Sequence, residues 1–187
     1  MAKTTKNEIL ETLSVLLQTK QLDDITVTEL VERCGISRQA FYYHFSDLYG
    51  VVDYAIQLLM ERLSTIPPEN WKDALDLTVD ILREYRTVVL NAYRAYERSY
   101  VEHCLRRWAK PLVLPRALEA ARRHKVTQDQ AEFVADLFTQ ALVGIMLSWV
   151  DRGLPNSAVE RLDDFHILME GCMDFMMERL AQKNRPS

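Results

Sequence analysis

Apolar residues recur along this chain at spacings of three and four, and no stretch of useful length alternates apolar with polar residues. That periodicity places apolar side chains on one face of an α-helix, so we expect an all-α protein. The pattern predicts helices at about residues 6–19, two short helices within 26–45, and helices at 47–65, 70–85, 86–95 and 96–107, the last resuming after Pro111 and Pro115 to about 124; two long helices follow Thr127 and Ser157.

The two short helices carry their own start and stop signals. Thr26 can N-cap the first helix, and Glu29 three residues later completes a capping box. Gly35 tolerates the left-handed conformation that ends this helix, and Ser37 is a good N-cap for the next. Two short helices joined by a tight turn are typical of a helix-turn-helix, whose second helix enters the major groove of DNA.

With its flanking helices, this stretch covers about the first quarter to third of the chain and resembles the TetR family of bacterial transcription regulators. The resemblance is carried by Thr26–Val31, Cys34–Ser37 and Phe41–Phe45, and the wording of Ser37–Phe45 is similar to the subgroup that contains the activator of dihydroxyacetone kinase operons. It implies a three-helix helix-turn-helix head at the N-terminus and a helical ligand-binding and dimerisation body. It also implies a homodimer that binds double-stranded DNA under the control of a small-molecule effector or protein partner, without cofactor or enzymatic activity.

Side chains of the second short helix are the first candidates for DNA contact. Arg38 can take a guanine edge through two hydrogen bonds, and Gln39 can pair with an adenine edge or a phosphate. Tyr43 can contact a base or a thymine methyl group. A solvated position for Arg38, and packing on the preceding helix for Tyr42, are the alternative interpretations.

Residues around this set complete the predicted DNA-binding surface. Tyr42 and His44 match positions that contact the DNA backbone in the family, which fixes register rather than sequence. Thr28 could donate to a phosphate, and Ser46 can N-cap the following helix and present backbone N–H groups to a phosphate. The predicted DNA-binding residues are Thr28, Ser37, Arg38, Gln39, Tyr42, Tyr43, His44 and Ser46.

The charge of the chain argues against DNA binding by bulk electrostatics. The formal net charge is −4, and the first 50 residues hold five basic and seven acidic side chains. The family usually places a lysine three residues after Phe45, where this chain has Leu48. Binding must therefore rest on a few placed groups, with Lys3 and Lys6 either reaching DNA or lying in a solvated tail. An alternative function stays open: a helical co-regulator that acts through a protein partner and binds DNA weakly by itself.

We expect a DNA-binding domain at residues 1–50 and a regulatory and dimerisation domain at 51–187. A set of aromatic and polarisable side chains in the second domain could line a ligand pocket, although such a set at helical spacing is also typical of a filled core. The predicted pocket residues are Met60, Tyr85, Tyr93, Tyr96, Tyr100, His103 and Trp108.

The last two helices predict self-association. Thr127 with Gln130 and Ser157 with Glu160 form a capping box for each helix. Their apolar stripes are too wide to be covered by the remaining helices of one small subunit, so we expect a two-fold four-helix interface, with burial inside a monomer as the alternative. The predicted interface residues are Phe138, Ala141, Leu142, Ile145, Trp149, Phe165, Met169, Cys172, Phe175 and Met176.

Other classes of function lack the residues they need. An odd count of three cysteines predicts reduced, mostly buried thiols. The four histidines lack metal-ligand spacing, and no Gly-rich phosphate loop or nucleophile motif occurs. The N-terminus has no signal-peptide pattern and no apolar run reaches the length of a membrane span, so we expect a cytoplasmic protein that does not act at a membrane.

Overall fold

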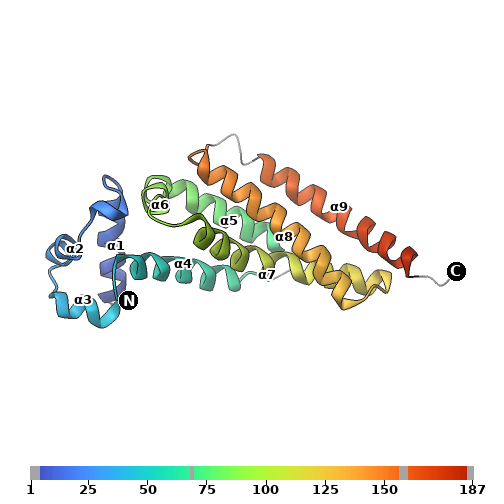
Figure 1. The fold of residues 1–187 in the computed structure, drawn as a ribbon, viewed down its shortest axis with the longest axis horizontal. Helices are drawn as coiled ribbons and strands as arrows, with labels where there is room; N and C mark the ends of the chain where they lie inside the picture. The colour runs from blue at the N-terminus through green and yellow to red at the C-terminus, as the bar shows by residue number, and fades with distance from the viewer. Residues whose placement is uncertain (1–4, 68–69, 156–159, 185–187) are drawn as a thin grey trace. The chain divides into compact units, whose positions relative to one another are not determined.

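A computed structural model describes residues 5–67, 70–155 and 160–184, and these ranges form helices and no strands (Figure 1). The all-α prediction is confirmed. The elements are α1 (Thr5–Leu17), the 3-10 helix η1 (Leu22–Asp24), α2 (Val27–Cys34), α3 (Arg38–His44), α4 (Leu48–Ser64), α5 (Trp71–Glu84), α6 (Arg86–Tyr93), α7 (Arg98–His124), α8 (Gln128–Asp151) and α9 (Glu160–Lys183).

The contacts within the chain divide it into two compact units. The first, called unit 1, is Met1–Thr65 with Glu84–Glu97, and the second, unit 2, is Ile66–Arg83 with Arg98–Ser187. Helix α6 therefore groups with the N-terminal helices, although it is distant from them in sequence. Residue 50, where the sequence predicts a domain boundary, lies inside α4, and that boundary stays a prediction.

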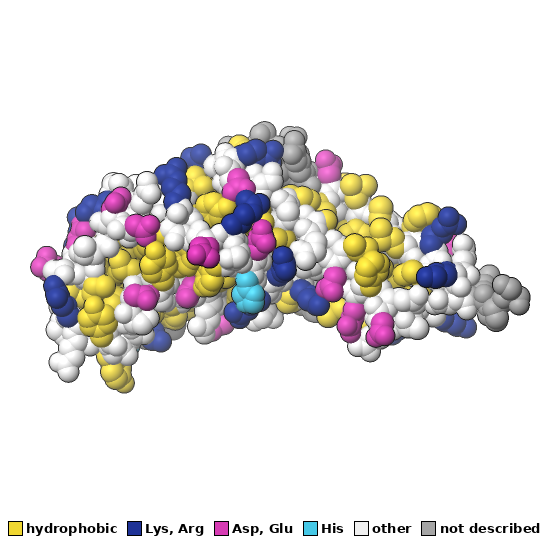
Figure 2. Space-filling model, viewed as in Figure 1, with side chains coloured by type: hydrophobic (Ala, Val, Ile, Leu, Met, Phe, Trp, Pro, Cys, Tyr) yellow, Lys and Arg dark blue, Asp and Glu magenta, His cyan; other side chains and the backbone are white. Residues whose placement is uncertain are grey.

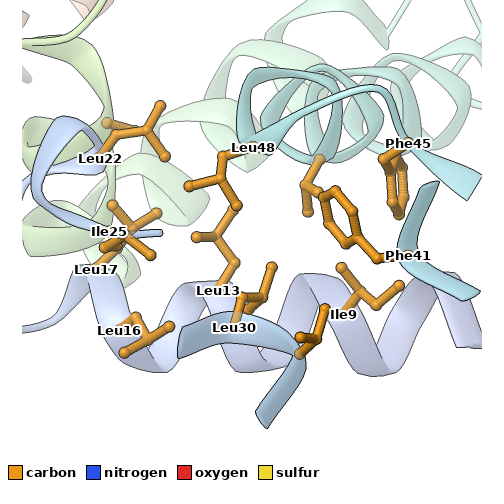
Figure 3. Packing of buried hydrophobic residues seen from close by; sticks show 13 residues of the cluster. Ile9, Leu13, Leu16, Leu17, Leu22, Ile25, Leu30, Phe41, Phe45 and Leu48 are labelled. Carbon is orange, nitrogen blue, oxygen red and sulfur yellow. The ribbon is translucent and has the colours of Figure 1, made fainter. Parts of the chain in front are cut away.

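Unit 1 is organised around a core shared by α1 to α4. Ile9 and Leu13 of α1 are fully buried, as are Leu30 of α2 and Phe41 of α3. Leu13 lies between Leu30 and Leu48, and Ile9 lies beside Phe41 (Figure 3). The two short helices α2 and α3 thus pack on α1 through one cluster of buried side chains. One core therefore fixes the orientation of α3, and with it the side chains on the outer face of α3.

The predicted caps hold the helix-turn-helix in shape. The hydroxyl of Thr26 accepts the backbone N–H of Glu29 at 3.2 Å, and that of Ser37 accepts the N–H of Ala40 at 3.1 Å. Gly35 has φ 69°, the left-handed conformation that glycine adopts without strain. Only one of the two hydrogen bonds of the predicted capping box forms, the one in which the Thr26 hydroxyl accepts from the backbone of Glu29. The Glu29 carboxylate, which would complete the box, instead accepts two hydrogen bonds from Lys20 Nζ, at 2.8 and 2.9 Å.

Polar contacts at and just after the C-terminal end of α6 join this segment to α1 and α4. The side-chain amide of Asn91 donates to the carbonyl of Leu17 at 2.9 Å. Just after α6, the Tyr96 hydroxyl donates to the carbonyl of Tyr49 at 3.3 Å, and the two rings meet edge to face at 5.2 Å. These bonds join segments that a sequence pattern does not connect.

Unit 2 contains α5, α7, α8 and α9, with α7 and α8 forming its most extensive helix pair. Helix α7 runs unbroken through Pro111 and Pro115, so the interruption predicted there is wrong. Proline inside a helix removes a backbone hydrogen bond and costs about 3 kcal/mol or more. Val113 and Ala117, in the same stretch of α7, are fully buried, so this part of the helix packs in the core of unit 2.

Helix α8 begins with the predicted capping box, in which Thr127 and Gln130 bind each other's backbone N–H groups. The box predicted for the last helix depends on Ser157, which lies outside the described residues. Among the described residues, α8 alone is long and apolar enough to pass a length-and-composition test for a membrane span, but 56% of its apolar window is buried within the protein.

Candidate DNA-binding surface

Helix α3 turns one side chain inward and its polar and aromatic residues outward. Phe41 is fully buried, whereas Tyr42 is 57% exposed and Tyr43 84% exposed. Arg38 and Gln39 at the start of the helix are exposed as well. A tyrosine combines an apolar ring with a hydroxyl that can form hydrogen bonds, so it can contact a partner in both ways. The outer face of α3 is therefore a surface of amphipathic groups, each able to form hydrogen bonds.

Ring contacts limit the freedom of the aromatic residues on α3. Tyr42 meets the ring of Phe41 edge to face at 5.3 Å, and Tyr43 meets His44 in the same way at 4.9 Å. Tyr42 combines its contact with the core residue Phe41 with a largely exposed ring. This ring contact lies within α3, so the alternative in which Tyr42 packs on the preceding helix stays untested, and most of the Tyr42 ring is exposed.

Arg38 is tied to the first helix of the motif. Its Nη2 donates a hydrogen bond to the hydroxyl of Thr28 on α2. Thr28 is half-buried, and the contact joins the N-terminal turns of α2 and α3. The guanidinium is therefore held at the surface, in contact with a neutral group.

The start of α4 differs from the prediction. Asp47, and not Ser46, caps the helix: its carboxylate accepts the N–H of Gly50 at 2.8 Å. A carboxylate complements the positive end of the helix dipole. Ser46 is exposed and precedes the cap. Leu48, at the position where the family usually has lysine, is buried in the core of unit 1.

Several basic side chains of unit 1 already have partners. The Glu29 carboxylate pairs with Lys20 at 2.8 Å and lies 3.8 Å from Arg33. Lys6 Nζ lies over the rings of Phe45 and Tyr54, at 5.7 and 5.3 Å from their centroids. Lys3 is outside the described residues. Among the described residues of the motif, Arg38 keeps a positive charge that no carboxylate neutralises.

A polar contact also joins η1 to the first turn of α4. The Tyr49 hydroxyl donates to Asp23 Oδ1 at 2.8 Å. This hydrogen bond to Asp23, followed by partial desolvation and the negative charges of Asp23 and Asp47, raises the pKa of Tyr49 above its usual value. The raised pKa means that the Tyr49 phenol can donate to Asp23 up to a higher pH than an ordinary tyrosine could.

The fold and this surface define a helix-turn-helix DNA-binding protein. Residues 9–54 match the family described as bacterial regulatory proteins, tetR family, and residues 69–171 match a transcriptional regulator C-terminal region of TetR type. The chain belongs to the TetR family of transcriptional regulators. Its resemblance to this family is confirmed, and members of the family regulate transcription rather than catalyse reactions.

A solved structure shares the whole fold. The dihydroxyacetone kinase operon activator DhaS superposes with a TM-score of 0.73 over 91% of this chain and 97% of its own, at 18% sequence identity. No curated protein matches the sequence significantly. At this identity the likeness concerns the fold alone.

The structure does not gather the seven predicted pocket residues in one unit. Trp108 is a core residue, since its Nε1 donates to the buried Thr78 hydroxyl at 3.1 Å. Tyr96 packs against Tyr49 instead. The predicted pocket stays a prediction. Unit 1 contains Met60, Tyr85, Tyr93 and Tyr96, and unit 2 contains Tyr100, His103 and Trp108.

One open cavity lies between α7 and α9 of unit 2. Its volume is about 250 Å³, and it combines an apolar floor with charged walls. At one end Arg123 pairs with Asp174 at 3.0 Å, and His124 Nε2 lies 3.2 Å from the same carboxylate. None of the predicted pocket residues lines it. The lining residues are Arg116, Glu119, Ala120, Arg123, Met169, Met173 and Asp174.

Four of the ten predicted interface residues, Leu142, Trp149, Phe165 and Met169, are buried within unit 2 of the single chain, and the interface itself stays a prediction. Helical spacing shows that α8 and α9 have wide apolar stripes, but it does not show which part of a stripe faces a neighbouring helix. Of the other six, Phe138 and Ile145 are half-buried, and Ala141, Cys172, Phe175 and Met176 are exposed. Cys172 also departs from the expectation of mostly buried thiols.

Several large apolar side chains on the same two helices are exposed, and two of them, Phe175 and Met176, also belong to the predicted interface. We call this set the α8–α9 apolar face: Phe133, Leu137, Leu168, Phe175 and Met176. Phe133 and Phe175 are each 60% exposed. Hydrophobic side chains gather over these helices in the space-filling view (Figure 2). Phe133 and Leu137 are four residues apart, as expected for one face of a helix. The buried stripe that includes Leu142 and Trp149 also has helical spacing, so spacing could not tell the exposed stripe from the buried one.

Proposed function

We propose that this TetR-family regulator is a homodimer that recognises a roughly palindromic operator, with control through its C-terminal helices. The observation that carries the DNA-reading part is the outer face of α3, where Tyr42 and Tyr43 are exposed while Phe41 anchors the helix in the core. A helix held this way can enter the major groove without reorganising its own packing.

The roles of the individual side chains follow from their chemistry. Arg38 and Gln39, at the N-terminal end of α3, take base edges by paired hydrogen bonds, and Tyr43 contacts a base or a thymine methyl group. Tyr42 and His44 contact phosphates and set the register. Ser37, Thr28 and Ser46 supply further polar contacts to the backbone at the edges of this surface.

The α8–α9 apolar face supports the homodimer. Exposed apolar area of this kind is typical of a surface that associates, and a two-fold axis would bring the face against its own copy. In the DNA-bound dimer the two α3 helices should lie about one helical turn of DNA apart, roughly 34–36 Å. Sedimentation equilibrium measures the association directly, and a monomer at micromolar concentration would contradict it.

Operator binding would be regulated if a ligand or protein partner bound more tightly to a conformation with one spacing of the two α3 helices than to a conformation with another. Such a partner shifts the population toward that spacing and changes operator affinity by the ratio of its own affinities for the two states.

Arg38→Ala tests the reading surface. Wild-type protein first selects its preferred duplex from a random pool, and each variant is then titrated against that duplex and against random DNA. Loss of a paired guanine contact should reduce discrimination by about 1–3 kcal/mol. Arg83→Ala, a surface change on α5 in unit 2, is the matched control and should discriminate as the wild type does. Equal discrimination by Arg38→Ala and wild type would show that Arg38 does not read a base.

The second candidate function is a co-regulator that acts through a protein partner and binds DNA weakly alone. It is favoured by the acidic first 50 residues and by Leu48, which is buried where a lysine would contact phosphate. The random-pool selection separates the two. Enrichment of one sequence by the purified protein supports direct reading, and absence of enrichment favours the partner-dependent function.

A further inference from the structure

The hydrogen bond between Arg38 and Thr28 connects the reading helix to the helix before it. Arg38 Nη2 donates to Thr28 Oγ1, and the two residues stand near the N-terminal ends of α3 and α2. An exposed arginine ordinarily samples many rotamers, and losing that freedom opposes any contact it forms. A fixed acceptor on a neighbouring helix removes part of that loss before DNA arrives.

The geometry leaves Arg38 able to bind a base. A guanidinium has five N–H donors, and Thr28 occupies one hydrogen of Nη2. The second Nη2 hydrogen, with a donor from Nη1 or Nε, still provides the pair that a guanine edge requires. The hydroxyl also keeps its own proton, which can be donated to a phosphate oxygen.

The hydrogen-bond partner of Arg38 is neutral, whereas the partner of the nearby basic side chains Lys20 and Arg33 is a carboxylate. Lys20 and Arg33 share the Glu29 carboxylate, which offsets their charge. A carboxylate at position 28 would hold Arg38 more strongly, but it would also repel the DNA backbone and compete with the base. A hydroxyl restrains the side chain while its positive charge remains available.

We propose that Thr28 is a positioning residue for sequence discrimination, holding the guanidinium of Arg38 in the orientation that reads a base; this role rests on the proposed function. Ordering one long side chain in advance should strengthen specific binding by about two- to twelvefold. Random DNA, where Arg38 meets no suitable base, should gain little.

Thr28→Val and Thr28→Ser test this role with the duplex selected by wild type. Valine keeps the branched shape and removes the acceptor, whereas serine keeps the acceptor. We expect Thr28→Val to lose about fivefold in discrimination between selected and random DNA, with random-DNA affinity unchanged within about twofold. Thr28→Ser should restore wild-type discrimination. In an Arg38→Ala background, Thr28→Val should have no further effect.

A second readout needs no DNA. In the free protein, ¹⁵N relaxation of the Arg38 side-chain Nε should show an ordered group in wild type and Thr28→Ser and a disordered one in Thr28→Val. Circular dichroism melting confirms that each variant is folded.

The outcomes separate the alternatives. Equal weakening of selected and random DNA by Thr28→Val, persisting in Arg38→Ala, would mean that Thr28 acts only as a phosphate contact and would overturn the positioning role. Higher discrimination in Thr28→Val would mean that the bond competes with reading, and would overturn it too. A wild-type protein that selects a sequence, with Thr28→Val equally selective, overturns this role alone. A wild-type protein that selects none overturns the proposed function and this role together.

Discussion

Two surfaces of this protein expose large side chains, and they differ in chemistry. The outer face of α3 exposes Tyr42 and Tyr43, each with a hydroxyl, beside the charged Arg38. The α8–α9 apolar face exposes Phe133, Leu137 and Phe175, which have no polar atoms in their side chains. The first surface suits a polar, negatively charged partner that offers hydrogen bonds. The second suits a partner that is itself apolar, which a second copy of the chain would be.

The two surfaces also differ in how they are supported. Helix α3 is short, and it is held by the Ser37 cap, the Phe41 anchor and the Arg38–Thr28 bond. Helix α8 is long and has one apolar stripe buried within unit 2 beside another that is exposed. A reading surface needs a few side chains held in one orientation. An association surface needs area, and its strength then depends on a few central residues.

The largest expected effect is on the free energy of unfolding, and it compares the buried apolar stripe of α8 with the exposed one. Trp149 is 1% exposed, and its Nε1 donates to the carbonyl of Pro155 at 3.0 Å. Trp149→Ala should lower the free energy of unfolding by about 3–5 kcal/mol, because it leaves a cavity and an unpaired carbonyl. Urea unfolding measures this. Phe133→Ala is the control, and a similar loss there would mean that the two stripes do not differ.

The next effect is on association. Phe175→Glu should raise the dimer dissociation constant by about 30-fold or more, because it removes an aromatic contact and places a charge in an apolar interface. Val15→Glu is the matched control, since Val15 is also apolar and 61% exposed but lies on α1 in unit 1. Sedimentation equilibrium of the two variants checks this. If Phe175→Glu dimerised as well as Val15→Glu, the α8–α9 apolar face would not be the interface.

The smallest expected effect is a difference in stability between substitutions of the two serines that flank α3, Ser37 and Ser46. Ser37→Ala removes the cap of α3 and should cost about 1 kcal/mol of stability. Ser46→Ala should stay within about 0.5 kcal/mol of wild type, because Asp47 caps α4 instead. Thermal unfolding of both variants provides the comparison. Equal losses would restore a capping role for Ser46.

The reading unit was largely predictable because its signals are local. A cap at Thr26 or Ser37, and a left-handed turn at Gly35, depend on residues within a few positions along the chain. The inward position of Phe41 follows from the same helical spacing. What escaped prediction in unit 1 depends on residues far apart in sequence: the capture of Glu29 by Lys20, and the contact of Tyr96 with Tyr49.

The amino-acid sequence by itself determined the helical class, the helix-turn-helix and its outward-facing residues, because capping and periodicity act over one or two helical turns. Tertiary structure alone decided that α7 continues through its two prolines, and that Trp149 is interior while Phe133 is exposed. Periodicity identifies an apolar stripe, but the interior is decided by which helix packs against it. That choice depends on the free energy of the whole arrangement, which no single segment encodes.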